Sequence, residues 1–377
     1  MEKVKRLYPL KFEEGSMVLD QNTVVANGFL AENSIDDIIE TYLEDFLGRD
    51  VFQYYKGEFP LRVSYLESDG NMPLQAHPND FTALERYESI GCAKVWYILE
   101  AEKDARICLG FSHQMDASSF YEECLGGELE KDLNFISPQA GDCIYIEPGT
   151  VYAALGKIKY IEVAQNSRVT YHLYDLNCGA STSSSGSKVQ QDGNDYMMEI
   201  SEAIDVINYE PFDRQKYLFK NITGNLTIAD TSDFIIKLLS FGNSGAPDAA
   251  AVSAIEISPE SLESFVALLC LKGKVKIKAE DGVMYEITQG EFSLLPANLR
   301  NVQLLADDAV VIESYMPLLS GEDLYMNYYE DESNYPEGSG LDPEDDEDSC
   351  DCGDDECDCH HHHHSHHHDH HHGGSCR

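Results

Sequence analysis

Short apolar or alternating runs, each closed by turn residues, dominate two long stretches of this sequence. The first stretch holds five such runs, at residues 60–68, 94–101, 105–111, 142–149 and 158–164. The second stretch extends from about Thr227 to Pro317. Runs of this length with a period of two are typical of antiparallel strands. The pattern therefore predicts a mainly β protein.

A weak internal repeat links the two stretches. Gly141-Asp142 precedes an apolar run that ends at a proline and a small residue, and Gly290-Glu291 precedes a second run of the same kind. A glycine followed by an acid, leading into a strand that ends at proline, suits a repeated β-barrel hairpin. We predict two β-barrels of the jelly-roll type.

Three segments are predicted to be helical. Residues 34–47 begin with Ser34 and Asp37 at the spacing of a capping box and carry apolar residues at helical spacing. An insertion from about Ala117 to Lys131 follows Asp116, a candidate N-cap. Residues 197–207 also have a helical pattern, and the small polar residues at 179–195 before them predict a loop.

These signals divide the chain into four predicted parts. They are a first barrel (1–178) with a helical insertion near 117–131, a loop and helical connector (179–215), a second barrel (216–318) and a Cys/His-rich tail (319–377). A length of 377 residues with 42% hydrophobic content supports two domains with their own cores. The tail is highly charged and has few apolar residues, so we predict that it is disordered.

The chain is strongly acidic, with a formal net charge of −42, and residues 320–377 alone hold 18 Asp or Glu against one Arg. Such a surface repels nucleic-acid phosphates and anionic lipid, so we expect neither as a partner. The sequence shows no apolar run of 18 residues and no secretory signal. We therefore predict a cytoplasmic protein.

Six cysteines lie in the body of the chain without paired spacing: Cys92, Cys108, Cys124, Cys143, Cys178 and Cys270. In a chain without a secretory signal, such residues are expected to be reduced and mostly buried thiols rather than disulfides.

Four blocks of sequence follow one another in a recognisable order. They are PLQAHPND (73–80), GCAKVWYIL (91–99), GDCIYIEPGTVYAALG (141–156) and IEVAQNSRVTYHLYDL (161–176). In order and spacing they resemble the class I mannose-6-phosphate isomerases of the short bacterial cupin type, over about Leu7 to Pro317. The resemblance implies two cupin barrels with a helical insertion, one zinc ion, and interconversion of mannose 6-phosphate and fructose 6-phosphate. Moving a proton between C1 and C2 needs a Lewis acid for the developing oxyanion and a base nearby.

The resemblance also implies four zinc ligands: a glutamine and a histidine spaced Q-x-H, a glutamate and a second histidine. Gln75 and His77 match the first two, but Lys94 stands at the glutamate position and Tyr152 at the second histidine position. An ammonium has no lone pair and repels a dication, and tyrosine rarely ligates zinc. We therefore interpret Gln75 and His77 as the remnant of a barrel metal site.

Other positions of the resemblance are partly changed. Cys92, Arg168 and His172 stand where the resemblance implies a lysine, an aspartate and an arginine. The matching positions that are kept are Trp96, Tyr97, Glu162, Gln165, Asn166, Tyr171 and Asp175. The scaffold is thus kept while the reaction centre is rewritten.

Two residues are candidates for catalysis, His172 and Lys94. His172 can serve as an acid, a base or the cation that replaces the arginine, and the alternative is a satisfied core histidine. Lys94 can hold a carboxylate, phosphate or sugar oxygen, and the alternative is a lysine whose stem packs in the barrel while its head reaches water.

Five residues are candidates for a substrate pocket: Gln75, His77, Tyr152, Glu162 and Arg168. For Gln75 and His77 the alternative is that they are hydrogen-bonded lining residues of a barrel that no longer binds metal. For Tyr152 the alternative is that it fills the space of the missing imidazole, with its hydroxyl bonded locally.

The tail carries a second candidate metal site. Its ligands are Cys350, Cys352, Cys357, Cys359, His360, His361, His362, His363, His364, His366, His367, His368, His370, His371 and His372. Imidazoles and thiolates at this density bind zinc, nickel or copper. The alternative, an expression tag, is normally an unbroken run without cysteine pairs before it.

Three functions remain open at this point. The resemblance implies an isomerase acting on a sugar phosphate, although the changed ligands argue against efficient turnover. A second hypothesis is a non-catalytic cupin that binds a sugar phosphate or regulates an active relative. The third is a metal-buffering protein that acts through its tail and delivers metal to a partner not yet known.

Overall fold

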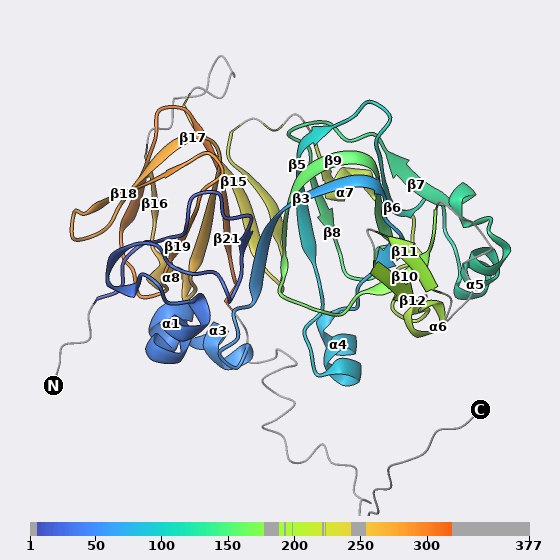
Figure 1. Ribbon diagram of the computed structural model, residues 1–377, viewed down its shortest axis with the longest axis horizontal. Helices are drawn as coiled ribbons and strands as arrows, with labels where there is room; N and C mark the ends of the chain where they lie inside the picture. The colour runs from blue at the N-terminus through green and yellow to red at the C-terminus, as the bar shows by residue number, and fades with distance from the viewer. Residues whose placement is uncertain are drawn as a thin grey trace, which may run out of the picture. The chain divides into compact units, whose positions relative to one another are not determined.

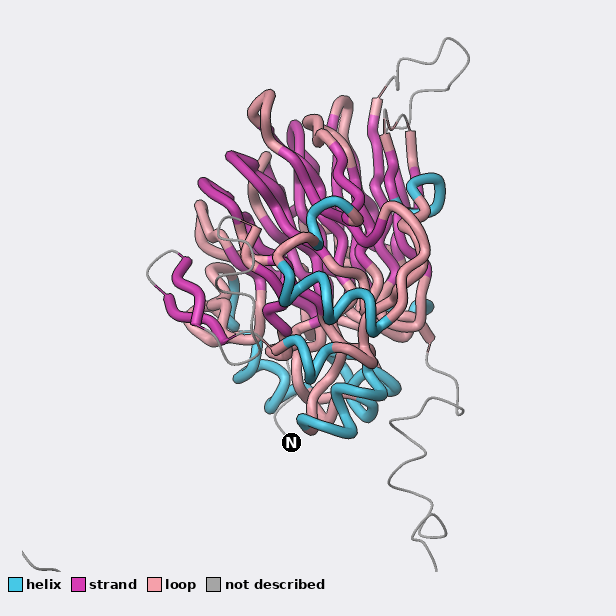
Figure 2. The backbone as a smooth tube through the Cα atoms, turned by 90° about the vertical axis from the view of Figure 1, so that its right-hand side faces the viewer, coloured by secondary structure: helices cyan, strands magenta, loops and turns pink. Residues whose placement is uncertain are grey.

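Antiparallel strands are the main secondary structure of the protein, as the computed structural model in Figure 1 shows. It describes residues 6–176, 188–191, 194–197, 199–220, 222, 224–242 and 254–318. The strands gather into two large sheets, and Figure 2 shows several of the helices grouped toward one end of the strands. The prediction of a mainly β fold with two barrels is confirmed.

The first sheet contains ten strands. Its long strand β9 (Tyr152–Gln165) pairs with β3 (Leu61–Asn71), β4 (Leu74–Ala76), β5 (Lys94–Ala101) and β6 (Arg106–Phe111). The others are β2 (Val18–Leu19), β7 (Leu133–Ile136), β8 (Cys143–Ile146), β10 (Tyr171–Tyr174) and β13 (Leu218–Phe219). Gly156, with φ +80°, lies within β9, where an added Cβ would come within 3.3 Å of the Cα of Ala105.

The second sheet contains nine strands. Here β17 (Val266–Lys278) pairs with β18 (Met284–Thr288), β19 (Phe292–Leu295), β20 (Val302–Leu305) and β21 (Ala309–Tyr315). The others are β1 (Leu10–Lys11), β14 (Leu226–Asp230), β15 (Ile235–Phe241) and β16 (Ala254–Ile257). Each sheet therefore has one long strand that pairs with several neighbours, so that the sheet curls into a barrel.

The two sheets exchange short strands. β1 joins the second sheet, with Leu10 opposite Leu294, and the hydroxyl of Ser293 donates to the carbonyl of Leu10 at 2.8 Å. β13 joins the first sheet through β8. One buried cluster draws side chains from both sheets, among them Val63 and Leu294. The two barrels therefore share strands and part of their core. The four-part division of the chain stays a prediction.

The repeated turn has the same geometry in both barrels. Gly141 and Gly290 both adopt φ +88°. Asp142 accepts a bond from the backbone N–H of Gln139 at 2.9 Å, and Glu291 accepts one from Thr288 at 2.7 Å. In both turns, the acidic side chain that follows the glycine accepts a hydrogen bond from the backbone N–H three residues earlier.

The helix predicted at residues 34–47 is present but broken. Ser34 and Asp37 form the expected capping box of α1 (Ile35–Tyr42). Leu43, with φ +51°, separates α1 from α2 (Glu44–Leu47). The carbonyls of Phe46 and Leu47 accept bonds from the backbone of residues 297 and 265 of the second barrel. These contacts with the second barrel replace a continued helix.

The remaining helices partly match the predictions. Asp116 caps α5 (Ala117–Gly126), which is followed by η2 (Leu129–Lys131), so the predicted insertion is confirmed. The prediction at residues 179–207 is wrong in part, because β11 (Lys188–Gln191) pairs with β12 (Asn194–Met197) and α6 is confined to Ile200–Ala203. The others are η1 (Gly28–Leu30), α3 (Arg49–Tyr54), α4 (Asp80–Tyr87), α7 (Arg214–Tyr217) and α8 (Pro259–Leu262).

Five of the body cysteines are free and buried, as predicted: Cys92, Cys108, Cys124, Cys143 and Cys270. Cys178 and the predicted disordered tail lie outside the described residues. Within the described part of the chain, no helix has both the length and the apolar character needed to cross a membrane.

Candidate functional site

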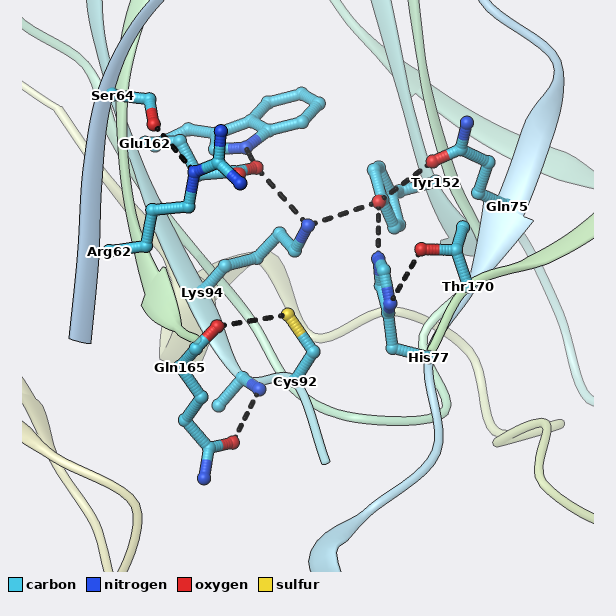
Figure 3. Close-up of polar contacts among 12 residues, drawn as sticks. Arg62, Ser64, Gln75, His77, Cys92, Lys94, Tyr152, Glu162, Gln165 and Thr170 are labelled. Atoms are coloured by element: carbon cyan, nitrogen blue, oxygen red, sulfur yellow. Dashed lines mark hydrogen bonds and ion pairs between the residues drawn. The ribbon is translucent and has the colours of Figure 1, made fainter. Parts of the chain in front are cut away.

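Strands β4, β5 and β9 bring candidate residues to one face of the first sheet. Gln75 in β4 lies opposite Tyr152 in β9, and Trp96 in β5 lies opposite Glu162 in β9. Directly opposed residues share a face, and so do residues two apart along a strand. Lys94 therefore joins Trp96 and Glu162 on this face, as Figure 3 shows for the polar groups.

The hydroxyl of Tyr152 is the centre of the site (Figure 3). It lies 2.6 Å from Nε2 of His77, 3.0 Å from Oε1 of Gln75 and 3.1 Å from Nζ of Lys94. Tyr152 is only 2% exposed, and its ring stacks on that of His77 with an interplanar angle of 17°. Three polar groups, two from the β4 segment and one from β5, thus converge on one buried oxygen.

That hydroxyl has one hydrogen, which fixes the direction of the bonds. Nδ1 of His77 lies 2.6 Å from the carbonyl of Val169, which can only accept, so Nδ1 carries a hydrogen. Burial and the Lys94 ammonium lower the pKa of His77 well below its usual value, so Nε2 accepts the hydrogen of Tyr152. Gln75 is drawn in Figure 3 with its oxygen toward that hydroxyl. Two acceptors would then face each other, so we expect the amide to present its NH₂ group instead.

Lys94, which is buried, and Glu162, whose side chain is 17% exposed, form an ion pair. Nζ of Lys94 lies 3.1 Å from Oε2 of Glu162, and the same oxygen accepts from Nε1 of Trp96 at 2.8 Å. The Lys94 side chain is 6% exposed, so the interpretation in which its head reaches water is wrong. Burial opposes the ammonium form, but neighbouring acidic groups, Glu162 among them, outweigh it and raise the pKa of Lys94 well above its usual value. The central cation is therefore already neutralised by a carboxylate.

Cys92 and Gln165 fix the backbone just before Lys94. The amide of Gln165 accepts from the backbone N–H of Ala93 at 2.8 Å and donates to Asp80 at 3.1 Å. Cys92 is buried against the carbonyl of Gln165, and burial raises the pKa of its thiol to about 11. The thiol is therefore neutral and unreactive at neutral pH.

His172 and Arg168 lie outside the cluster around the Tyr152 hydroxyl. His172, in β10, is opposite Gln75 of β4, but its Nδ1 lies 3.9 Å from Oε2 of Glu199. Burial lowers the pKa of His172. Arg168 is exposed in the segment between β9 and β10. The structure thus brings five of the seven candidates together, and the roles predicted for all seven stay predictions.

Arg62 and Ser64 lie on the same face and were given no role from the sequence. Ser64 in β3 is opposite Glu162, and Nε of Arg62 donates to the Ser64 hydroxyl at 3.3 Å (Figure 3). Arg62 and Lys94 are both opposite Ala164, from the two sides of β9. The alternation of polar and apolar residues at 61–64 was the signal that could have placed them.

Comparison with known proteins shows similarity over most of the described chain. Probable mannose-6-phosphate isomerase GmuF of Bacillus subtilis is 25% identical over 280 residues, which cover 73% of this chain and 79% of that protein. The mannose-6-phosphate isomerase of Streptococcus mutans is 24% identical over 291 residues, covering 77% and 83%. This chain is a relative of the mannose-6-phosphate isomerases. No family model matches it.

A solved structure supports the same fold. The mannose 6-phosphate isomerase of Bacillus subtilis superposes with a TM-score of 0.59 at 19% identity, covering 80% of this chain and 90% of that chain. A likeness at this identity shows the fold of this relative of the isomerases and nothing finer.

The zinc ion implied by the resemblance to the isomerases does not fit the residues present. Zinc needs three or four lone-pair donors. At the point where Gln75 and His77 converge, the third side chain is the ammonium of Lys94, and Nε2 of His77 is taken by the hydrogen of Tyr152. Among the described residues, no three His, Cys, Asp or Glu side chains form a group that could hold a metal ion. The predicted tail ligands lie outside those residues.

Proposed function

We propose that this chain is a non-catalytic cupin of the mannose-6-phosphate isomerase family, serving as a sugar-phosphate-binding or regulatory module. The proposal rests on the buried hydroxyl of Tyr152. His77, Gln75 and Lys94 already occupy its hydrogen-bonding positions. Aldose–ketose isomerisation needs a stabiliser for the developing oxyanion and a group that moves a proton. In this network the cation is paired with Glu162 and the imidazole with the phenol.

A coupled assay on mannose 6-phosphate tests this proposal. We expect no turnover above the background of the coupling enzymes, with or without added zinc, cobalt or manganese. The Bacillus subtilis relative, assayed in parallel, controls for the coupling system. Calorimetry with mannose 6-phosphate and with mannose then measures whether the phosphorylated sugar binds. Turnover that is lost in the variant His77→Ala would overturn the proposal.

We also propose metal binding by the tail, on the observation that residues 350–376 combine eleven histidines with two Cys-x-Cys pairs. Every member of the four buried clusters lies between Leu7 and Met316, so a chain ending at Glu330 keeps the whole core. We expect the full chain to bind several equivalents of zinc or nickel and the shortened chain to lose them. If the bound metal is the same in both chains, the tail is not the binding part.

A further inference from the structure

The second barrel holds a trio of side chains with the chemistry of the first. Nζ of Lys237 donates to the hydroxyl of Tyr315 at 2.8 Å and lies 3.8 Å from Oε2 of Glu313. The same ammonium is 4.9 Å from the centre of the Tyr315 ring, and Lys94 is 5.0 Å from the ring of Tyr152. In both barrels a lysine therefore contacts both a glutamate and a tyrosine.

The glutamates of the two trios occupy equivalent places. Glu162 follows Ile161 in β9, and Glu313 follows Ile312 in β21. Ser64 and Trp96 are opposite Glu162, and two residues of the neighbouring strands β15 and β17, at 237 and 268, are opposite Glu313. In both barrels the carboxylate thus lies in the middle of the sheet, with a strand on each side.

The lysines reach these glutamates from opposite sides. Lys237 is directly opposite Glu313 on β15, whereas Lys94 comes from β5, on the side of Trp96. A buried carboxylate requires a cation or several donors, and either neighbouring strand can supply one. Each barrel thus supplies a lysine to its carboxylate, but from a different strand. This recurrence indicates that the lysine, glutamate and tyrosine stabilise the barrel.

We propose that the ammonium of Lys94 is the resident cation of the first barrel and, with the phenol of Tyr152, holds Gln75, His77 and Glu162 in place without a metal ion. The contacts at 2.6, 3.0 and 3.1 Å join all five side chains into one network. The inference rests on the proposed function in taking this barrel to be metal-free, and its test measures unfolding and metal binding instead of turnover.

Recurrence of the trio favours this structural role over an acid–base role for Lys94 and Tyr152. An acid–base pair has to reach a substrate, but Tyr152 is 2% exposed and the Lys94 side chain 6%. Lys237, with a side chain 34% exposed, makes the same contacts outside the candidate site. A network needed for the fold is expected in both barrels, and a catalytic device only in one.

Thermal unfolding of the chain ending at Glu330 provides the first test. We expect the same unfolding midpoint after treatment with a chelator, after addition of zinc, and without either. Metal analysis of the same protein should find no zinc that depends on His77. A midpoint that falls on chelation and returns with zinc would overturn the proposal, whatever the isomerase assay shows.

Replacing the two groups that exclude metal provides the second test. The double variant Lys94→Glu with Tyr152→His exchanges the ammonium and the phenol for zinc ligands, beside Gln75 and His77. We expect it to bind one equivalent of zinc and to lose that zinc when His77→Ala is added. A folded double variant that binds no zinc would overturn the proposal. If the variant does not fold, the chelation measurement on the unaltered chain decides.

Discussion

Replacing Lys94 by methionine should lower the free energy of unfolding by about 3–5 kcal/mol. Methionine keeps an unbranched stem in the barrel but leaves Glu162 with the N–H of Trp96 in place of a cation. A buried charge that has lost its partner is among the largest sources of destabilisation. Trp96 is the only tryptophan and is fully buried, so its fluorescence during urea unfolding reports on this site directly.

Lys237→Met is the matched control for this prediction. It removes the same contacts, with Tyr315 and Glu313, from a lysine whose side chain is 34% exposed instead of 6%. Lys237 lies 3.8 Å from Glu313, against 3.1 Å between Lys94 and Glu162, and water reaches its ammonium, so the lost interaction is weaker although the Glu313 side chain is itself 6% exposed. We expect a smaller loss, about 1–2 kcal/mol. Equal losses in the two variants would contradict the importance of burial at Lys94.

The strands were the part of the fold that the sequence could predict well. Alternation of apolar and polar residues is a local property, and each of the five runs in the first stretch lies on a strand. Gly141 and Gly290 could be matched for the same reason, since a turn with positive φ and an acid after it is readable from two residues. Local signals therefore fixed the element types and the internal repeat.

Contacts between distant segments could not be predicted. β1 is two residues long and pairs with a strand more than 280 residues later. A strand this short has no periodic pattern from which it could be predicted. Leucine favours helices, yet Leu43 separates α1 from α2. We attribute this break to the hydrogen bonds that Phe46 and Leu47 accept from the second barrel. Both features depend on packing between the barrels, which a single stretch of sequence does not contain.

The same limit applies to the site. Lys94 and Tyr152 could be singled out because they stand where the resemblance implies zinc ligands. Their partners could not be derived, since Glu162 is 68 residues from Lys94 and pairs with it only through the register of β5 and β9. The sequence thus predicted a changed metal site, and the structure shows an ammonium in contact with a carboxylate and a phenol at these positions.

Gly48→Ala should destabilise the protein by about 2–5 kcal/mol, because the residue meets two separate requirements. Gly48 adopts φ +96° and ψ 148° between α2 and α3, a backbone conformation found almost only at glycine, which costs an L side chain about 1–3 kcal/mol. An added Cβ would also lie 2.0 Å from the carbonyl oxygen of Glu263, the residue that ends α8 in the second barrel. The two backbone segments cannot easily move apart to make room for the Cβ, because the N–H of Phe265 donates to the carbonyl of Leu47.

Gly141→Ala separates the two requirements. Gly141 has φ +88°, but an added Cβ would meet nothing within 4 Å, so only the backbone conformation is penalised and we expect a loss of about 1–2 kcal/mol. Urea unfolding of both variants, followed by circular dichroism, measures the difference. Because the excess in Gly48→Ala comes from contact between the N-terminal helices and the second barrel, equal losses would mean that this contact adjusts freely. A clearly larger loss at Gly48 would show that the close approach between this helical segment and Glu263 cannot adjust to an added Cβ.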